Sequence, residues 1–67
     1  MRKIYARLPD GQIVSRQTYK SYTHVVVARN LENSWFAVRW TRQPADALNR
    51  ATGQGYRDAR LIDVEER

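Results

Sequence analysis

The side chains in this sequence that are best suited to chemistry are basic and aromatic, and they are interleaved along two short segments. The first segment contains Tyr22 and His24, and the second contains Trp35 and Arg39. Aromatic rings stack on nucleic-acid bases, and arginine grips phosphate or carboxylate groups. The same residue types dominate the energetic centres of protein interfaces. These residues therefore indicate a binding surface and do not indicate a reaction.

Catalytic and metal sites find little support in the sequence. His24 is the only histidine and there is no cysteine, so a catalytic pair would need a hydroxyl nucleophile and a carboxylate to orient the imidazole. The two acids of the same half, Asp10 and Glu32, fall in predicted turns. Metal binding would need His24 to meet Asp58 or Asp63, and none of these stands at a diagnostic spacing. We therefore predict no enzyme activity, no metal and no other cofactor, with a small nuclease or toxin using His24 as general base as the catalytic alternative.

The charge of the chain is positive and unevenly distributed. The 67 residues include 12 Lys and Arg against 7 Asp and Glu, for a net charge of +5. Eight of the bases and two of the acids lie at or before Arg42, whereas four bases and five acids follow it. A basic field of this kind attracts phosphate or other acidic partners. The alternative is that the charges only keep the edges of a sheet soluble.

Size and apolar content limit the class of protein. A chain of this length has room for one domain, residues 1–67, and without cysteine it has neither disulfides nor a thiolate zinc site as a staple. The basic start is not followed by an apolar run of signal-peptide length. No segment approaches the roughly 18 apolar residues needed to cross a bilayer. We therefore expect a soluble, cytoplasmic protein without membrane contact.

The elements that must position the candidate residues are mostly strands. Residues 3–8 alternate between polar and apolar side chains, and the turn at 9–12 leads to a return strand over 12–18. Residues 22–29 include three successive valines, which predicts burial on both faces. A turn then leads to a strand over 35–41.

A short helix and a last strand complete the predicted fold. Pro44 suits the first helical position, Asp46 suits the first turn and Gly53 suits the end of a helix. The apolar stripe of this helix contains Ala45, Leu48 and either Ala51 or Thr52, with Leu48 as its one large anchor. Residues 56–66 alternate in part and predict a fifth strand. The sequence thus predicts an α+β protein in the order β-β-β-β-α-β, with one small antiparallel sheet of four to five strands and the helix packed on one face.

Strand alternation then predicts which residues share the open face of this sheet. In the second hairpin, Phe36, Val38 and Trp40 point to the side opposite Trp35, Ala37 and Arg39. If the helix covers the apolar side, the open side forms a surface for stacking and phosphate contact. The alternative is that Tyr22 and Trp35 pack as cross-strand neighbours covered by Arg39. The predicted partner-binding or nucleic-acid-binding residues are Lys3, Tyr5, Arg7, Arg16, Tyr22, His24, Trp35 and Arg39.

One part of the chain resembles a group of short bacteriophage or prophage accessory proteins of unassigned function. The resembling residues are Tyr22-Thr-His-Val-Val-Val27, the tryptophan-containing strand after them, and Pro44-Ala-Asp-Ala-Leu48, within about half of the chain. The resemblance implies a protein of the host bacterial cytoplasm that binds and blocks host machinery, as anti-CRISPR proteins do. It implies no catalytic residues.

Together these features favour a small non-enzymatic binding protein of phage type. Its expected action is to bind and modulate or inhibit a host protein or nucleoprotein complex. The alternative is a module that binds RNA or single-stranded DNA through a basic, aromatic sheet face. A homodimer formed through a free sheet edge is a further expectation of a fold with unpaired strands.

Overall fold

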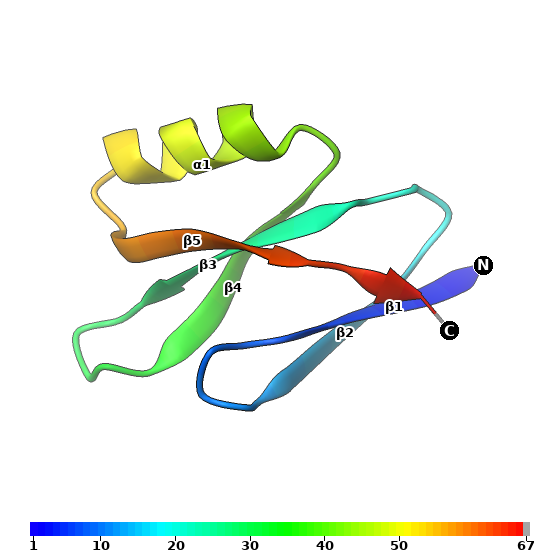
Figure 1. Ribbon diagram of the computed structural model, residues 1–67, viewed down its shortest axis with the longest axis horizontal. Coiled ribbons are helices and arrows are strands. Elements are labelled where there is room, and N and C mark those ends of the chain that lie inside the picture. The colour runs from blue at the N-terminus through cyan, green and yellow to red at the C-terminus, as the bar shows by residue number, and fades with distance from the viewer. Residues whose placement is uncertain (67) are drawn as a thin grey trace.

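The computed structural model describes residues 1–66, which form six strands and one helix (Figure 1). The predicted α+β class is confirmed, as is the position of the helix between the fourth and fifth strands. The elements are β1 (Arg2–Arg7), β2 (Ile13–Thr18), β3 (His24–Arg29), β4 (Trp35–Thr41), α1 (Pro44–Gly53), β5 (Arg57–Asp63) and β6 (Glu65–Glu66).

The strands divide between two antiparallel sheets of three strands each, where the sequence predicts one sheet. We call β4-β3-β5 the central sheet and β2-β1-β6 the outer sheet. The division falls within the predicted last strand, because β5 pairs with β3 whereas β6 pairs with Ile4 and Tyr5 of β1. At Val64, between them, the backbone N–H donates to the carbonyl of Thr23, 3.0 Å away. One continuous stretch of chain therefore joins the two sheets along one side.

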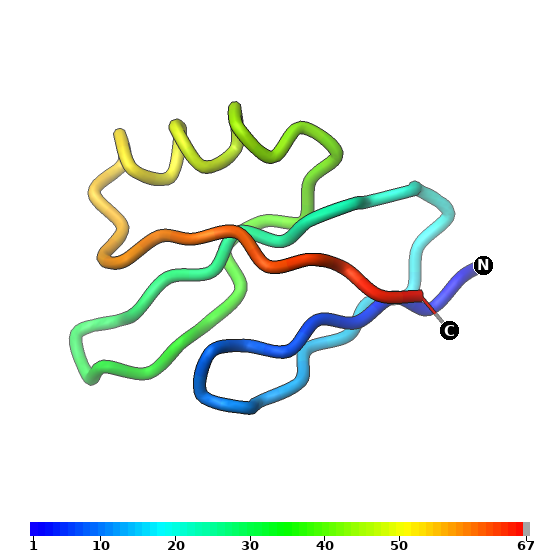
Figure 2. The backbone as a smooth tube through the Cα atoms, viewed as in Figure 1, coloured from blue at the N-terminus to red at the C-terminus, as the bar shows by residue number. Residues whose placement is uncertain are grey.

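The central sheet lies between the helix and the outer sheet, which gives three layers (Figures 1 and 2). Val25, Val26 and Val27 are all fully buried. Val25 and Val27 pack toward the outer sheet, whereas Val26 packs against α1. The three successive valines of β3 are thus explained by burial on both faces, as the sequence predicts.

The outer sheet is covered on one face only. Ile4, Ala6 and Leu8 are buried, whereas the alternating residues of β1 lie on the opposite face. Tyr5 pairs with Ser15 of β2, which is exposed, so this opposite face is turned to solvent. The pattern of apolar residues at every second position matches a sheet that buries one side.

A β-bulge in β4 changes which side chains share a face. Val26 pairs with Arg39 and Val27 pairs with Ala37, so Val38 is the extra residue. Before the bulge the alternation is as predicted, but after it the phase is reversed. Trp40 consequently packs toward the outer sheet with Trp35, and the prediction that these two tryptophans lie on opposite faces is wrong.

The helix packs through small residues. Ala47 and Ala51 are buried against Val26, whereas Leu48 is only half-buried, so the prediction of Leu48 as the main anchor is wrong. Alanine lets the helix backbone approach the sheet closely, which favours this stripe over the one with the larger side chain. Before the helix, the Gln43 N–H donates to Oγ1 of Thr41, 2.9 Å away.

Candidate functional site

The predicted binding residues do not form one face in the structure. Three of them, Lys3, Tyr5 and Arg7, do lie together on the solvent side of the outer sheet. Trp35 instead faces the space between the two sheets, where it packs against the buried core. The prediction of a single surface is wrong because the strands belong to two sheets stacked on each other, so their open sides differ.

Trp35 is the centre of a group of charged residues drawn from three strands. We call Arg29, Trp35, Arg57, Asp58 and Arg60 the arginine–tryptophan cluster. The strand register brings its members together, because Arg29 pairs with Trp35 on one side and with Arg57 on the other. The cluster therefore lies at the end of the central sheet where β3 ends and both β4 and β5 begin.

Two guanidinium groups contact the ring of Trp35. The Cζ atom of Arg60 lies 4.8 Å from the ring centroid, and the Cζ atom of Arg29 lies 5.4 Å from it. Both distances fall within the range of a cation–π interaction. Trp35 is half-buried, so its ring serves as a platform that holds two positive charges near each other.

The carboxylate of Asp58 partly neutralises this group. Nε of Arg29 donates to Oδ2 of Asp58 at 2.8 Å, and Nη2 of Arg29 lies 2.6 Å from the same oxygen. The hydrogen bond from Arg29 and the charge of the same guanidinium lower the pKa of Asp58, with smaller contributions from the charges of Arg57 and Arg60. The cluster therefore keeps a positive balance, with one acid against three arginines.

Two residues with positive φ shape the cluster. Asp58 has a φ of 53° and lies where the pairing of β3 with β5 shifts register. Asn33, with a φ of 63°, accepts a hydrogen bond from Nη2 of Arg57 at 3.3 Å. Asn and Asp adopt this left-handed conformation more readily than other residues that have a Cβ atom. In the part of the chain that the structure describes, Arg60 forms no ion pair within 4.0 Å and is exposed, so its guanidinium is available to a partner.

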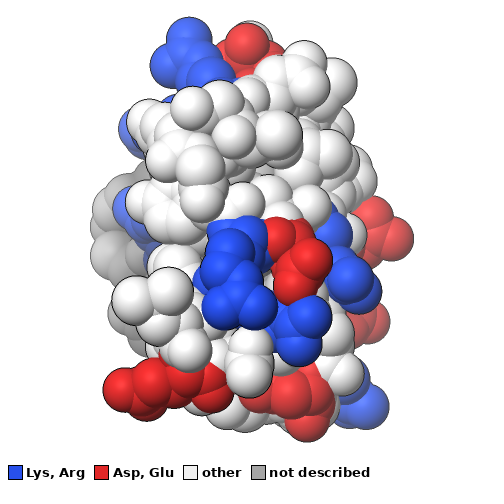
Figure 3. All heavy atoms as spheres, turned by 90° about the vertical axis from the view of Figure 1, so that its left-hand side faces the viewer, with Lys and Arg blue, Asp and Glu red and all other residues white. Residues whose placement is uncertain are grey.

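The surface at this end of the molecule is visibly charged. Figure 3 shows the end at which the β3–β4 turn and the start of β5 lie. Lys and Arg side chains gather near the middle of this face around Asp or Glu side chains, and further Asp or Glu side chains lie at the right-hand and lower edges of the view. Guanidinium groups held in place on an aromatic ring are suited to carboxylates and phosphates, because they bind such groups through paired hydrogen bonds.

A second basic and aromatic group involves the connection between β2 and β3. The Cζ atom of Arg16 lies 5.3 Å from the centroid of the Tyr22 ring. Nη1 of Arg2 donates to Oγ of Ser21 at 2.9 Å. Tyr19 is 79% exposed, the most exposed aromatic side chain among the described residues. Of the residues that the sequence predicts, Arg16 and Tyr22 are therefore brought together here, apart from Trp35.

His24 lies on the side of the central sheet that faces α1, away from Trp35 and from the group of Lys3, Tyr5 and Arg7. Its Nε2 is 3.1 Å from Oδ1 of Asp63, and its Nδ1 is 2.9 Å from Oγ1 of Thr23. The Thr23 hydroxyl donates to the carbonyl of Thr41 at 3.4 Å. The side chain of Asp63 is 90% exposed, so water competes for its carboxylate. These contacts join the start of β3 to the ends of β4 and β5 at the protein surface.

Arg39 also lies on the helix side, contrary to the prediction. It lines a small hollow of about 90 Å³ together with Arg50 and Tyr56, and its side chain is exposed. The bulge at Val38 separates Arg39 from Trp35, since it reverses the alternation between them. Arg39 therefore does not cover the ring of Trp35, and Arg29 and Arg60 occupy that position instead.

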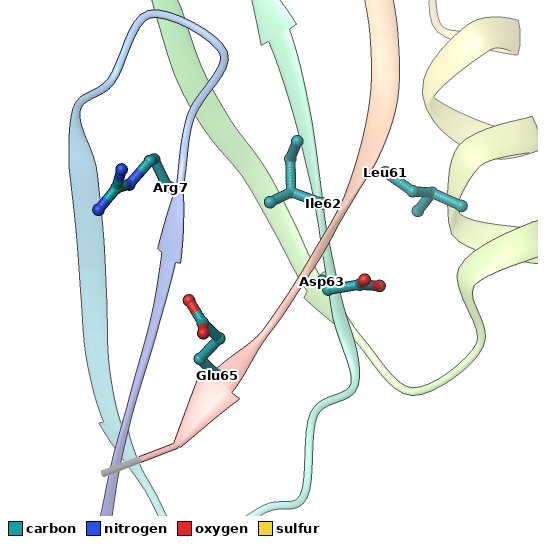
Figure 4. Close-up of a pocket in the computed structure, with 5 residues that line it drawn as sticks. All are labelled: Arg7, Leu61, Ile62, Asp63 and Glu65. Carbon is teal, nitrogen blue, oxygen red and sulfur yellow. The ribbon is translucent and has the colours of Figure 1, made fainter.

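A hollow of about 550 Å³ lies where the two sheets diverge. It is lined by Arg7 of β1, residues 61–63 of β5 and Glu65 of β6 (Figure 4). Ile62 points toward β1, whereas Leu61 and Asp63 point toward the helix. The polar groups around this hollow do not converge on one point, so its lining does not define a ligand.

The sequence offers only a partial signal for the cluster. Alternation places Arg60 on the same side of its strand as Ile62 and Val64, and both of these do pack toward the outer sheet. That β5 pairs with β3 beside Trp35 follows from the fold and not from any local pattern. Arg29, Arg57 and Asp58 are consequently missed by reasoning from sequence.

Two general features of residues 1–66 bear on function. No three His, Asp or Glu side chains among them come close enough to hold a metal ion. The helix that they form is too short and too polar to cross a membrane.

Comparisons of the chain with models of protein families, with curated proteins and with solved structures found no match.

Proposed function

We propose that this protein is a small, non-enzymatic binding protein that docks the arginine–tryptophan cluster onto an acidic surface of a host protein or nucleoprotein complex. Residues 22–27 and 44–48 resemble phage accessory proteins, and this resemblance implies that binding modulates or inhibits the complex. The observation that carries the proposal is the placement of Arg29 and Arg60 over the ring of Trp35.

The arrangement favours acidic groups over nucleic-acid bases at this site. A base would stack on the open face of an aromatic ring. Trp35 is half-buried and carries two guanidinium groups, so the arginines are the groups that it presents. Because their side chains are held by the ring, less conformational entropy is lost when they bind a carboxylate. A partner with clustered Asp or Glu side chains fits these features.

The β2–β3 connection supports a second candidate function, the binding of RNA or single-stranded DNA. Tyr19 is 79% exposed and is followed by Lys20, so its ring is open to a base and a cation stands beside it in the chain. Arg16 and Tyr22 are close by in sequence and contact each other. This arrangement fits a stacking site of modest affinity.

Binding of defined probes distinguishes the two functions. Polyglutamate and single-stranded RNA are titrated at about 50 and about 200 mM salt with wild-type protein and with Arg60→Ala, Tyr19→Ala and Arg42→Ala. Arg42→Ala removes one exposed charge outside the cluster and is the matched control. We expect Arg60→Ala to weaken polyglutamate binding about tenfold and Arg42→Ala to change it less than about twofold. Equal losses of polyglutamate affinity in Arg60→Ala and Arg42→Ala would show that binding depends only on net charge and would contradict the proposal.

The RNA titration tests the second function. Binding that is tighter than that of polyglutamate, falls steeply with salt and is lost in Tyr19→Ala would favour the nucleic-acid module.

A further inference from the structure

The outer edge of β4 is a free strand edge. The order of the central sheet is β4-β3-β5, so β4 has a neighbour on one side only. β5 is also an edge strand, but it continues into β6 and so joins the central sheet to the outer sheet. The backbone groups of β4 that point away from β3 pair with no other strand of residues 1–66.

The register identifies these outward groups. Ser34 accepts from Asn30 and Thr41 accepts from Thr23, so the carbonyls at both ends of β4 point toward β3. In an antiparallel pair the backbone groups alternate in direction from one residue to the next. By this alternation, the N–H and C=O groups of Trp35 and Ala37, before the bulge, and of Trp40, after it, point away from β3.

The edge of β4 differs from the other free edges in its side chains. Five of its seven residues are apolar, and Arg39 is its only charge. The edge strand β5 carries Arg57, Asp58, Arg60 and Asp63, and charges of this kind discourage pairing with another strand. β2 is mainly polar and includes Ser15, Arg16, Gln17 and Thr18. Among the longer edge strands, β4 is therefore the one best suited to receive another strand.

Charge decides what the occupant is. A second copy of this chain would bring together two molecules that each carry a net charge of +5. An acidic strand would instead be attracted by this net charge and by Arg39, which is exposed near the middle of β4, with Arg29 of β3 and Arg60 of β5 on the ring of Trp35 at the start of β4. Strand addition supplies affinity through backbone hydrogen bonds and specificity through side-chain contacts.

We infer that β4 accepts an extended acidic segment of the partner as an added strand. This inference rests on the proposed function and specifies the form in which the acidic partner binds: its backbone pairs with the outward groups of Trp35, Ala37 and Trp40, and its carboxylates lie nearest Arg39.

Two peptide probes of equal charge test the inference. One alternates glutamate with threonine, and the other has the same sequence with every backbone amide N-methylated, which removes the N–H groups that a ladder needs. We expect the unmethylated probe to bind wild-type protein about tenfold more tightly, because only this probe can pair with the edge. Hydrogen exchange followed by NMR should show that the unmethylated probe slows exchange of the Ala37 and Trp40 amides and leaves the amides of Ser15 and Gln17 unchanged.

Protein variants provide an independent test with a matched control. Ala37→Pro removes an outward N–H of β4, and Ser15→Pro does the same on β2, whose outward groups alternate from Gln12 in the same way. We expect Ala37→Pro to abolish the advantage of the unmethylated probe and Ser15→Pro to preserve it, with circular dichroism confirming that both variants fold. Arg39→Glu, which leaves the backbone intact, should weaken binding of the unmethylated probe about tenfold.

The outcomes separate this inference from the proposed function. Equal binding of the two probes, with no amide protected, would overturn strand addition and leave docking of the cluster in place. Protection along β2 or β5 would place the peptide on another strand edge. Protection of β4 in a dimer without any peptide would make a second copy of the chain its occupant. Either result would overturn the inference. If neither peptide binds, both the inference and the proposed function fail.

Discussion

The central sheet and the outer sheet use similar residues under different constraints. The central sheet is covered by α1 on one face and by the outer sheet on the other, whereas the outer sheet is covered on one face only. Basic residues of the outer sheet, such as Lys3 and Arg7, are accordingly exposed. On the central sheet the same residue types become part of the packing, as Arg29 does over Trp35. Arg39 and Arg60 of the central sheet remain exposed, so the covering layers limit the exposure of only some of its basic residues.

A charge buried in the central sheet should destabilise the protein far more than a charge placed on the open face of the outer sheet. Val26 of β3 is fully buried against α1, so Val26→Asp places an unpaired carboxylate in the core. This should lower the free energy of unfolding by more than about 4 kcal/mol, and most molecules of so small a domain should then be unfolded. Ser15→Asp on the open face of the outer sheet should change the free energy of unfolding by less than about 0.5 kcal/mol. Urea unfolding followed by circular dichroism measures both, and comparable losses would refute the difference between the sheets.

Trp35 tests how much the packed face of the central sheet depends on an aromatic ring. Trp35→Ala removes a half-buried side chain from the contact between the sheets and should destabilise the protein by about 2 kcal/mol. Tyr19→Ala, at a ring that is 79% exposed, should cost less than about 0.5 kcal/mol. Thermal unfolding of the two variants should therefore differ clearly, and a neutral Trp35→Ala would show that the ring does not support the sheet contact.

Asp58 gives the cluster of the central sheet a pH dependence. Contact with Arg29 lowers the pKa of Asp58 below its ordinary value of 3.8. A carboxyl whose folded pKa is lowered adds stability above its unfolded pKa, and this contribution is lost as the pH falls through the folded pKa. The melting temperature of wild-type protein should thus fall on acidification from about pH 5 to about pH 2 more than that of Asp58→Asn.

Asn suits position 58 because it tolerates the positive φ found there. The control is Glu32→Gln, an exposed carboxyl in the β3–β4 turn, which should follow the wild-type curve. Identical acid curves for wild type and Asp58→Asn would show that the contact with Arg29 does not stabilise the fold.

The solvent side of the helix should give the smallest effect. Asp46 and Arg50 form an exposed ion pair one turn apart, with 3.2 Å between Oδ2 and Nε. Asp46→Ala should cost about 0.3 to 0.5 kcal/mol, and added salt should reduce the difference from wild type because salt screens exposed charges. A larger loss that does not respond to salt would mean that Asp46 supports the packing of α1 and not only its surface.

The local elements could be predicted from sequence because their signals are local. Alternation in 3–8, the three valines of β3, and Pro44 before a helix each act within a few residues, and the structure has the corresponding strands and helix. That α1 packs through Ala47 and Ala51 was harder to predict from sequence. An apolar stripe shows which residues can be buried, but the space beneath the helix decides which of them are.

The candidate site was harder to predict because it depends on pairing between distant strands. Of the eight predicted residues, only Trp35 belongs to the arginine–tryptophan cluster. The bulge at Val38 moves Arg39 to the helix side, and the register of β5 on β3 brings Arg60 to the ring. A one-residue change of register exchanges the faces of every later side chain, so alternation alone cannot locate a surface across a bulge.

The sequence by itself determined the α+β class, the basic charge, and the strands and helix that residue pattern encodes. Tertiary structure alone decided that the strands form two sheets, that Arg29 and Arg60 meet at Trp35, and that β4 keeps a free edge. The physical reason is the range of the forces involved. Backbone preference and alternation act between near neighbours, whereas sheet order and register follow from how the whole chain buries its few large apolar side chains.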